Sequence, residues 1–357
     1  ERLEIDLPSH LIVLQGDNAQ GKTNLLEAMY FLTTAKSHRA SAERELLSWA
    51  APDNEPTAAR IVANVQTTSG ELRVEIALSN YSPSSEGQIQ KRIKVNGVPR
   101  RAFDLIGQVS MVMFTSQDIE LIDGSPSRRR RYLDIAISQV DRRYLRALQR
   151  YNKVLAQRNQ LLKLIAERRA DEGQLGFWNG ELVEHGSYII EQRRAMIDEL
   201  NGLAPPIHSG ISGGESLKID YMPSVDAGGF RERLREIRSR ELAQRMSLIG
   251  PHRDDLAFMV NDADMNPYGS RGQQRTVALS LKLAEAAYLR AKIGDEPVIL
   301  FDDVLSELDS ARRHRLMEAA SAYRQVIITT TDIDYFEPEF LANATRFRVS
   351  AGTVAAL

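Results

Sequence analysis

The chain has 357 residues, of which 43% are apolar and 26% are charged, and its formal net charge is −2. These values are typical of a globular protein with one large or two moderate domains, and any surface for nucleic acid must be local because no global positive excess exists. The sequence has no cysteine, which excludes disulfides and thiolate metal sites and fits a reducing cytosol.

The first part of the chain predicts strands around one helix. Because the sequence begins with Glu1 and soon enters a strand, we expect a short N-terminal piece to be missing. The expected elements are a strand at His10–Gln15, a helix to about Ala35, a hairpin of 60–67 and 71–78, a second hairpin around Asn96-Gly97, and a buried strand at 109–114.

From about Ile119 the pattern changes to long polar helices. Apolar residues recur at spacings of three and four from Tyr144 to Ile165, interrupted by Arg158, and again from Trp178 until Pro205-Pro206 ends the pattern. A charged helix at about 229–246 follows. The two long helices predict an antiparallel hairpin or a short coiled-coil arm.

The remaining sequence alternates between strands and helices. Expected here are a strand at 256–260, a helix at 273–292, a strand at 297–301, a helix from about Ser310, a strand at 325–330 and an extended stretch at 346–350. Continuous apolar strands that alternate with helices favour a mainly parallel α/β sheet covered on both faces. We therefore expect residues 1–118 plus 247–357 to form one domain and residues 119–246 to form an inserted helical arm.

A phosphate-binding loop lies between the first strand and the first helix. Its two glycines let the backbone curl around phosphates, the lysine would reach the β- and γ-phosphates, and the threonine hydroxyl would coordinate Mg²⁺. The alternative is an accidental glycine turn with a helix cap. The predicted ATP-binding residues are Gly16, Asp17, Asn18, Ala19, Gln20, Gly21, Lys22, Thr23 and Asn24.

A pair of acids ends the apolar strand that begins at Pro297. Buried carboxylates at a strand end are costly without a cation or hydrogen-bond donors. Beside a phosphate loop, Asp302 is interpreted as the Mg²⁺-side acid and Asp303 as the group that orients or activates water, with Lys22 as their catalytic partner. The alternative is an exposed turn after a core strand.

A second polar segment opens the helix predicted at 273–292. It reads "SRGQQRT", in which Ser270 and the Gly272 N–H, together with the helix dipole, would form another anion site. A simple helix cap is the alternative. One nucleotide does not need two phosphate cradles in one chain, whereas two chains that face each other would use both. The residues of this segment are Ser270, Arg271, Gly272, Gln273 and Gln274.

The segments "GDNAQGKTN", "SRGQQRT", "LFDDVLSELD" and "VIITTTD", in this order around a helical insertion, resemble the ABC-type (SMC-like) ATPases of chromosome maintenance. Within that class the sequence is most similar to the RecF family of recombination and gap-repair proteins. "KSHRA", "DGSPSRRRRYLD" and "LIGPHRDDL" extend the resemblance over nearly the whole chain. It implies an ABC-type P-loop head, with a mixed sheet and an antiparallel β subdomain, and an inserted helical arm.

The resemblance also implies a mechanism. Two chains would bind head to tail with two ATPs between them, each ATP held by one phosphate loop and by the SRGQQ segment of the other chain. It places Ser306 and Asp309 in the loop that crosses this interface, Thr329 and Thr330 at the switch position, and Gln117 as the residue that senses Mg²⁺ or water. Asp303 replaces the glutamate of transporter relatives, and a carboxylate set back by about an ångström favours slow hydrolysis.

The partners implied by the resemblance are DNA, a second copy of the chain, RecR, and indirectly RecO and RecA. The expected protein is cytoplasmic and associated with the nucleoid, without a membrane span, and has a weak ATPase stimulated by DNA. DNA contacts would go to phosphates and be independent of sequence. The candidate arginines, for which a solvated helix face is the alternative, are Arg128, Arg129, Arg130, Arg131, Arg142, Arg143, Arg100 and Arg101.

Two other functions are compatible with parts of the pattern. An ATPase subunit of a membrane transporter would share the phosphate loop, but the helical insertion, Asp303 and the absence of a switch histidine argue against it. A protein-only, ATP-dependent adaptor would use the same dimer without DNA.

Overall fold

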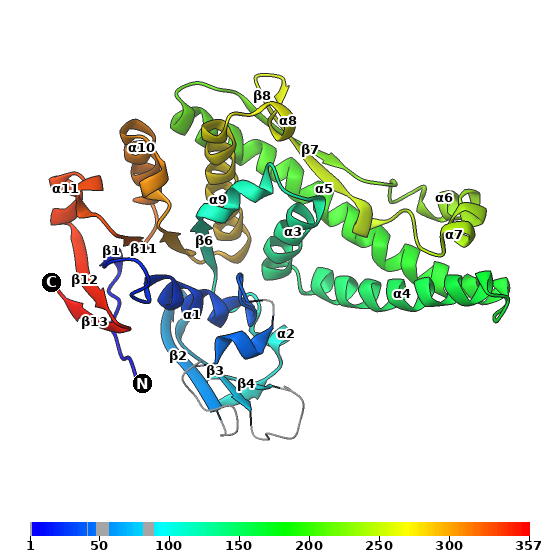
Figure 1. Ribbon diagram of the computed structural model, residues 1–357, viewed down its shortest axis with the longest axis horizontal. Helices are drawn as coiled ribbons and strands as arrows, with labels where there is room; N and C mark the ends of the chain where they lie inside the picture. The colour runs from blue at the N-terminus through cyan, green and yellow to red at the C-terminus, as the bar shows by residue number, and fades with distance from the viewer. Residues whose placement is uncertain (1, 41, 48–56, 81–88) are drawn as a thin grey trace. The chain divides into compact units, whose positions relative to one another are not determined.

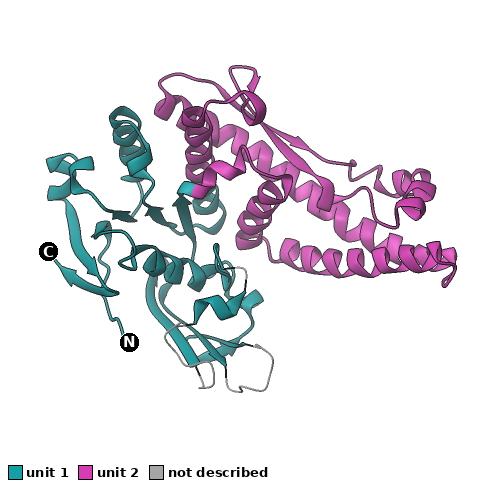
Figure 2. Ribbon diagram, viewed as in Figure 1, with its two compact units in different colours: residues 1–116, 285–357 teal, residues 117–284 magenta. Residues whose placement is uncertain are grey.

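The structure is a computed structural model that describes residues 2–40, 42–47, 57–80 and 89–357 (Figure 1). The chain divides into two compact units, shown in Figure 2. Unit 1 contains residues 1–116 and 285–357, and unit 2 contains residues 117–284. The second unit thus continues beyond residue 246, where the sequence pattern ends the insertion.

A six-stranded sheet forms the centre of unit 1, in the order β13-β12-β1-β11-β10-β6. Its strands are β1 (His10–Gln15), β6 (Met111–Thr115), β10 (Val298–Asp302), β11 (Gln325–Thr330), β12 (Ala344–Ser350) and β13 (Thr353–Ala356). All neighbours are parallel except β12 and β13. Because Gln15 pairs with Thr330 and Asp302 pairs with Thr329, the segments that follow β1, β10 and β11 begin at one edge of the sheet.

A separate antiparallel sheet completes the β structure of unit 1. It consists of β2 (Thr57–Thr67), β3 (Gly70–Asn80), β4 (Gln90–Val95) and β5 (Val98–Arg100). Both predicted hairpins are present, and the turn between β4 and β5 has φ values of 50° at Asn96 and 78° at Gly97, as a two-residue hairpin requires. Helix α1 (Lys22–Thr34) places Leu26 and Phe31 in an apolar core with Val74 of β3.

The remaining elements of unit 1 are short helices, together with the end of the long helix α9 (Arg271–Ile293). They are η1 (Glu43–Leu46), α2 (Ala102–Leu105), η5 (Leu305–Glu307), α10 (Ser310–Ala320), η6 (Ile333–Tyr335) and α11 (Pro338–Ala342). Helix α9 begins in unit 2 and ends in unit 1.

Unit 2 is mainly helical and carries a small antiparallel sheet, β7-β8-β9. Its other elements are η2 (Ser116–Leu121), α3 (Pro126–Val140), α4 (Arg142–Ala166), η3 (Glu172–Gln174), α5 (Leu175–Ser212), α6 (Phe230–Glu236), α7 (Arg238–Gln244), η4 (Pro251–Arg253) and α8 (Met265–Tyr268). The strands are β7 (Leu217–Met222), β8 (Asp255–Val260) and β9 (Ala263–Asp264). The strand expected at 256–260 is therefore real, but it pairs with β7 in unit 2.

Helices α4 and α5 form the antiparallel pair that the sequence predicts (Figure 1). The prediction that Pro205-Pro206 ends the second helix is wrong, because α5 continues to Ser212 and ends at Gly213, whose φ is 85°. The Asn201 side chain exchanges two 2.8 Å hydrogen bonds with the backbone of Ile219 in β7. This attachment just before the prolines, together with the burial of His208 after them, holds the helical path across the lost backbone bonds.

The charged helix expected at about 229–246 is divided into two. Helices α6 and α7 are separated at Ile237, which is buried with a φ of −92° and a ψ of 4°. The apolar residue at the break anchors the segment, as do Phe230 and Leu234 of α6, while most of the charged side chains on each side are exposed.

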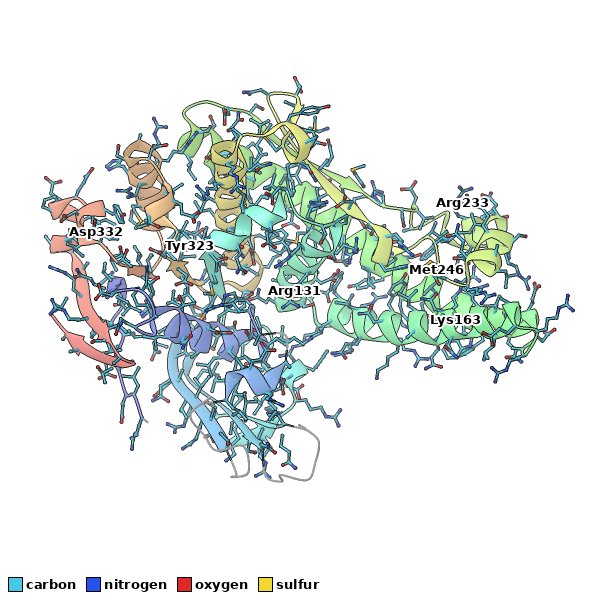
Figure 3. All side chains as sticks on the ribbon, in the orientation of Figure 1. Arg131, Lys163, Arg233, Met246, Tyr323 and Asp332 are labelled. Carbon is cyan, nitrogen blue, oxygen red and sulfur yellow. The ribbon has the colours of Figure 1, made fainter. Side chains whose placement is uncertain are left out.

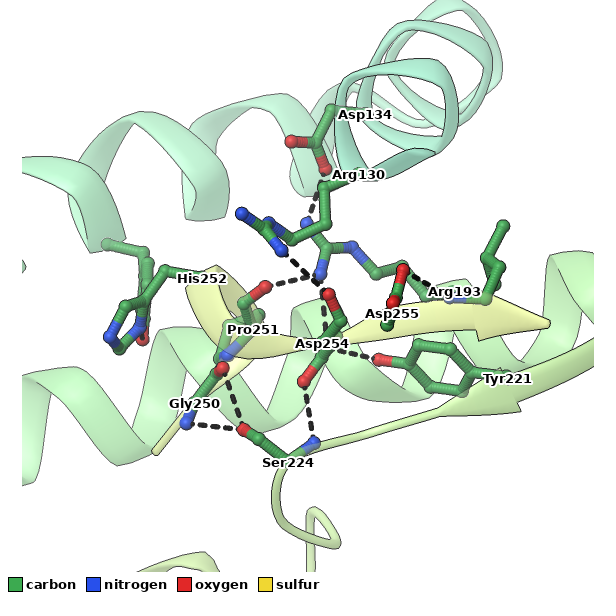
Figure 4. Close-up of polar contacts among 12 residues, drawn as sticks. Arg130, Asp134, Arg193, Tyr221, Ser224, Gly250, Pro251, His252, Asp254 and Asp255 are labelled. Atoms are coloured by element: carbon green, nitrogen blue, oxygen red, sulfur yellow. Dashed lines mark hydrogen bonds and ion pairs between the residues drawn. The ribbon is translucent and has the colours of Figure 1, made fainter. Parts of the chain in front are cut away.

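A buried polar cluster joins the elements of unit 2 (Figure 4). Arg193 of α5 is 2% exposed and donates to Asp134 of α3 at 2.8 Å and to Asp254, before β8, at 3.1 Å. Asp254 also accepts from the Tyr221 hydroxyl at 2.5 Å and from the Ser224 N–H at 2.9 Å. Charges so deeply buried are tolerated because each has charged and hydrogen-bonded partners.

Arg158, which interrupts the apolar pattern of α4, is also buried. Its side chain is 1% exposed and its guanidinium donates to Glu241 of α7 at 2.5 Å, to Ser247 at 2.7 Å and to Asn179 of α5 at 2.8 Å. The side chain of Glu241 is fully buried. The arginine therefore connects α7 to the α4–α5 pair.

Replacement of Arg158 with Met should lower the free energy of unfolding by about 3–5 kcal/mol, because Glu241 would remain buried without its cation. The matched control is Arg150→Met in the same helix. This arginine is 50% exposed and forms an ion pair with Glu181. This control should cost less than about 1 kcal/mol. Urea unfolding measures both changes, and equal losses would contradict the assignment.

Candidate nucleotide-binding site

The phosphate loop connects β1 to α1 and depends on two glycines. Gly21 immediately precedes the helix with a φ of 104°, a conformation that side-chain-bearing residues rarely adopt. A Cβ at Gly16 would lie 2.2 Å from the carbonyl oxygen of Val349 in β12. The loop backbone thus passes against β12 more closely than any other residue type permits.

The side chain of Lys22 lies over this loop and is largely buried. Its Nζ donates to the carbonyl oxygens of Gly16 at 2.5 Å and Asp17 at 2.8 Å. Burial lowers the pKa of Lys22, and the carboxylates of Asp303, Asp302 and Asp17 oppose that change. A concentrated positive charge beside the open backbone amides of a helix start suits a phosphate group.

Asp302, at the end of β10, joins the phosphate loop to β11. Its Oδ1 accepts hydrogen bonds from the hydroxyls of Thr23 and Thr329, both at 2.9 Å. Thr23 and Asp302 provide only oxygen ligands, which fits Mg²⁺. Since no cluster of three or more His, Asp or Glu among the described residues could hold a metal, phosphates and water would have to complete the coordination.

Asp303 follows directly and has a strained backbone, with a φ of 54°. Its N–H donates to the Thr329 hydroxyl at 3.0 Å, and its carbonyl accepts from Ser306 at 2.8 Å. Burial raises the pKa of Asp303, Asp302 adds to the increase and Lys22 opposes it. A carboxylate whose protonated form is favoured in this way can accept a proton from water.

The other residues that the sequence predicts around this site have clear local positions. Asp309 caps α10 by accepting from the Arg312 N–H at 2.9 Å, and Ser306 lies in η5. Thr330 is buried and donates to the Asp332 carbonyl at 2.7 Å, so it does not join Thr329 at the carboxylates. Gln117 is exposed in η2, and Asn24 is exposed in the first turn of α1.

The turn between β12 and β13 also supports the phosphate loop, a contribution that was not predicted from the sequence. The N–H of Ala351 donates to Gln20 Oε1 at 2.7 Å, and the N–H of Gly352 donates to the Gln20 carbonyl at 3.0 Å. Gln20 also donates to the Asn18 carbonyl at 3.4 Å. The Ala351-Gly352 pair after an extended stretch is a turn signal that could have predicted this hairpin.

The SRGQQ segment, in unit 2, forms the start of α9. Ser270 is exposed and accepts from the Gln273 N–H at 3.3 Å, while Gln273 Oε1 accepts from the Ser270 N–H at 3.2 Å, which is a capping box. Gln274 is buried and donates to the Met265 carbonyl at 2.9 Å. Arg271 is exposed, and Gly272 is partly exposed.

The eight candidate DNA-contacting arginines fall into two groups. Arg129 is 2% exposed and forms a two-point ion pair with Asp255, at 2.6 and 3.0 Å, so the structure removes it from the candidate surface. Arg130 is half-buried and donates to the Asp254 carbonyl at 2.8 Å, whereas Arg128 is exposed and pairs with Glu120 at 2.6 Å. The other five are also exposed: Arg131 (labelled in Figure 3), Arg142, Arg143, Arg100 and Arg101.

Comparisons with known proteins agree on one family. The sequence model of the RecF/RecN/SMC N-terminal domain matches residues 1–348. The DNA replication and repair protein RecF of Herpetosiphon aurantiacus is 43% identical over 99% of this chain and 95% of its own length. RecF of Chloroflexus aurantiacus is 44% identical with the same coverage of both chains.

Solved structures give the same result. A structure of the recombination mediator protein RecF with ATP, from the RecFOR pathway, superimposes with a TM-score of 0.87 at 32% identity, covering 100% of this chain and 94% of the other. An SMC head bound to part of ScpA is similar in fold alone, with a TM-score of 0.56 at 15% identity, covering 100% of this chain and 92% of the other.

The fold and the arrangement of Lys22, Thr23 and Asp302 define an SMC-like P-loop ATPase. Within that class, the chain belongs to the RecF family of DNA replication and repair proteins. The resemblance drawn from the sequence motifs is thereby confirmed, as is the expected ATPase-head fold. Within the described residues, no helix combines the length and apolarity needed to cross a membrane.

Replacement of Gly16 with Ala should lower the free energy of unfolding by about 1–3 kcal/mol, because the new Cβ would displace the Val349 backbone. The control is Gly202→Ala in α5, where a Cβ would meet no atom within 4 Å and where Ala should stabilise the helix by about 0.5–1 kcal/mol. Chemical unfolding distinguishes the opposite signs. A Gly16→Ala protein as stable as the wild type would contradict the close approach.

Proposed function

We propose that this chain is an ATP-dependent DNA-binding protein of repair and recombination, which dimerises head to tail around two ATPs and closes on DNA. The observation that carries the proposal is the junction at Asp302, where one carboxylate oxygen joins the phosphate loop through Thr23 to Thr329 on β11. Solved RecF–ATP structures of high similarity support ATP as the nucleotide. In this proposal residues 1–118 plus 247–357 form the ATPase head and residues 119–246 form the arm.

ATP would stabilise the dimer because its γ-phosphate contacts both copies of the chain. The exposed Ser270 hydroxyl, the Gly272 N–H and the second N–H of the Gln273 amide, whose first N–H donates to Glu215, are three donors that a second chain could bring to a γ-phosphate. At about 1.5 kcal/mol or more for each charge-assisted bond, they supply roughly 4–5 kcal/mol per site, a factor of about 10³ in affinity. ADP lacks the γ-phosphate and loses most of this gain, so hydrolysis would release the dimer.

Hydrolysis would use the two adjacent acids. Asp302 and Thr23 would hold Mg²⁺, whose charge stabilises the phosphates, and Asp303 would accept a proton from the attacking water. The short aspartate side chain and its strained backbone favour a slow reaction that acts as a timer. Stimulation of this ATPase by DNA is part of the proposal.

Replacement of Ser270 with Asp should abolish ATP-dependent dimerisation. Aspartate keeps the N-cap of α9 but directs a negative charge at the γ-phosphate of the second copy. Ser270→Thr, which keeps both the cap and the hydroxyl, is the control and should dimerise like the wild type. Analytical ultracentrifugation with ATP, ADP or no nucleotide measures the effect.

The outcomes of this experiment are distinct. The wild type should be dimeric with ATP and mainly monomeric with ADP. A molecular mass that never depends on nucleotide would exclude the clamp mechanism, whereas an ATP-dependent dimer that Ser270→Asp leaves intact would exclude this segment as the contact in trans.

DNA would bind through exposed arginines on α4 and the neighbouring elements. Arg142 is exposed in the first turn of α4, and Arg143 lies over the Tyr188 ring at 4.1 Å from its centroid, which fixes the direction of its guanidinium. Such contacts would go to phosphates and would be independent of sequence. RecR as a direct partner, and RecO and RecA as indirect partners, follow from membership of the family and belong to this proposal.

The double variant Arg142→Ala/Arg143→Ala should weaken DNA binding and reduce the slope of log K against log salt by about 2, since each lost phosphate contact removes about one released counterion. The control is Arg233→Ala/Arg235→Ala on α6, where both arginines are exposed and pair with nearby glutamates. Fluorescence anisotropy with gapped duplex DNA across a salt series, with and without ATP, provides the measurement. Absence of ATP-dependent DNA binding in the wild type would favour the protein-only adaptor instead.

A further inference from the structure

A second layer of polar residues supports the SRGQQ segment inside unit 2. Gln273 Nε2 donates to Glu215 Oε1 at 2.9 Å, while Gln273 Oε1 accepts from both the N–H and the hydroxyl of Ser270 at 3.2 Å. Glu215 lies between α5 and β7, and its side chain is 24% exposed. The amide of Gln273 thus connects an interior carboxylate to the exposed serine.

Glu215 is itself held from the interior side. Its Oε2 lies 3.5 Å from Nε2 of His208, a residue of α5 whose side chain is fully buried, and both of these atoms are shielded from solvent. His208 Nδ1 lies 3.1 Å from the Ser280 hydroxyl, which donates its own proton to the Thr276 carbonyl at 2.7 Å. Ser280 must therefore accept from His208, so Nδ1 carries a proton.

The proton on Nδ1 determines the kind of contact that His208 Nε2 can make with Glu215 Oε2. With Nδ1 protonated, the neutral imidazole would present a lone pair at Nε2 to a carboxylate oxygen, which is repulsive. A proton on Nε2 would turn this repulsion into an ion pair with Oε2, for which their separation of 3.5 Å is within range. The carboxylate is then anchored at Oε2, and its other oxygen remains directed at Gln273.

The orientation of the Gln273 amide follows from this anchor. A carboxylate oxygen accepts from an amide NH₂ but repels an amide oxygen, so Glu215 excludes the flipped amide. Only the unflipped amide presents its oxygen to the Ser270 N–H and hydroxyl. The Ser270 oxygen still accepts from the Gln273 N–H, so its proton can turn from Gln273 to an arriving phosphate oxygen without loss of the cap.

We propose that Glu215 is a positioning residue for the SRGQQ segment, because its carboxylate fixes the Gln273 amide and thereby directs Ser270 toward the γ-phosphate held by a second copy of the chain. The inference rests on the proposed function and extends it. The ligand is a nucleoside triphosphate bound by the other chain, and the phosphate loop of the same chain is not involved.

The test compares three variants in ATP-dependent dimerisation. Glu215→Ala should weaken the dimer by about tenfold per site, or about a hundredfold for a symmetric pair, because the amide and serine become free to reorient. Glu215→Gln should dimerise like the wild type, since the carbonyl oxygen of the new glutamine can accept from Gln273 while its NH₂ donates to a neutral His208. Glu181→Ala is the matched control, with a glutamate 23% exposed that pairs with Arg150, and it should leave the dimer unchanged.

Two further measurements distinguish positioning from loss of structure. ATP binding by isolated monomers should be equal in all three variants, and thermal unfolding of Glu215→Ala and Glu181→Ala should agree within a few degrees. Full dimerisation of Glu215→Ala, or failure of Glu215→Gln to restore it, would overturn the inference. If Ser270→Asp still blocks dimerisation in the same assay, the proposed function survives that result, whereas a wild type that never dimerises with ATP would remove both.

Discussion

One carboxylate oxygen determines the geometry of the candidate ATPase site. Asp302 Oδ1 receives the hydroxyls of Thr23, from the helix after the phosphate loop, and of Thr329, from the end of β11. Thr329 also accepts from the N–H of Asp303. The two acids are therefore fixed relative to the loop by neutral donors, in a sheet whose parallel register places all three segments at one edge. A shift of either threonine would disturb Asp302, and a shift of Thr329 would also disturb the backbone of Asp303.

Unit 2 contains buried arginines that are each paired with carboxylates. Arg193 meets Asp134 and Asp254, Arg158 meets Glu241, and Arg129 meets Asp255. These contacts join helices and strands that are far apart in sequence, and each needs its partner because an unpaired buried charge is strongly destabilising. Arginines that resemble a nucleic-acid surface in the sequence can thus be buried in ion pairs, so that only the exposed ones remain candidates for contact with DNA.

The sequence was informative where the information is local. The phosphate loop, the two acids at the end of β10 and both hairpins depend on glycine spacing, alternation and strand order, and all are found where the pattern places them. It failed where long-range contacts decide the structure. The carboxylate partner of Arg129 lies 126 residues away, the Asn201 contacts that carry α5 through Pro205 come from β7, and β8 pairs with a strand of unit 2. No window of neighbouring residues contains that information.

The pairing of β1 with late strands has a consequence for how the protein emerges from the ribosome. His10 pairs with Gln325 and Leu11 with Ala344, so β1 waits unpaired while more than 300 residues are synthesised. Unit 2, by contrast, is one uninterrupted stretch of chain and can fold as soon as it has left the exit tunnel. Unit 2 can therefore fold first during translation, and the apolar strand β1 stays accessible to chaperones until the last strands complete the sheet.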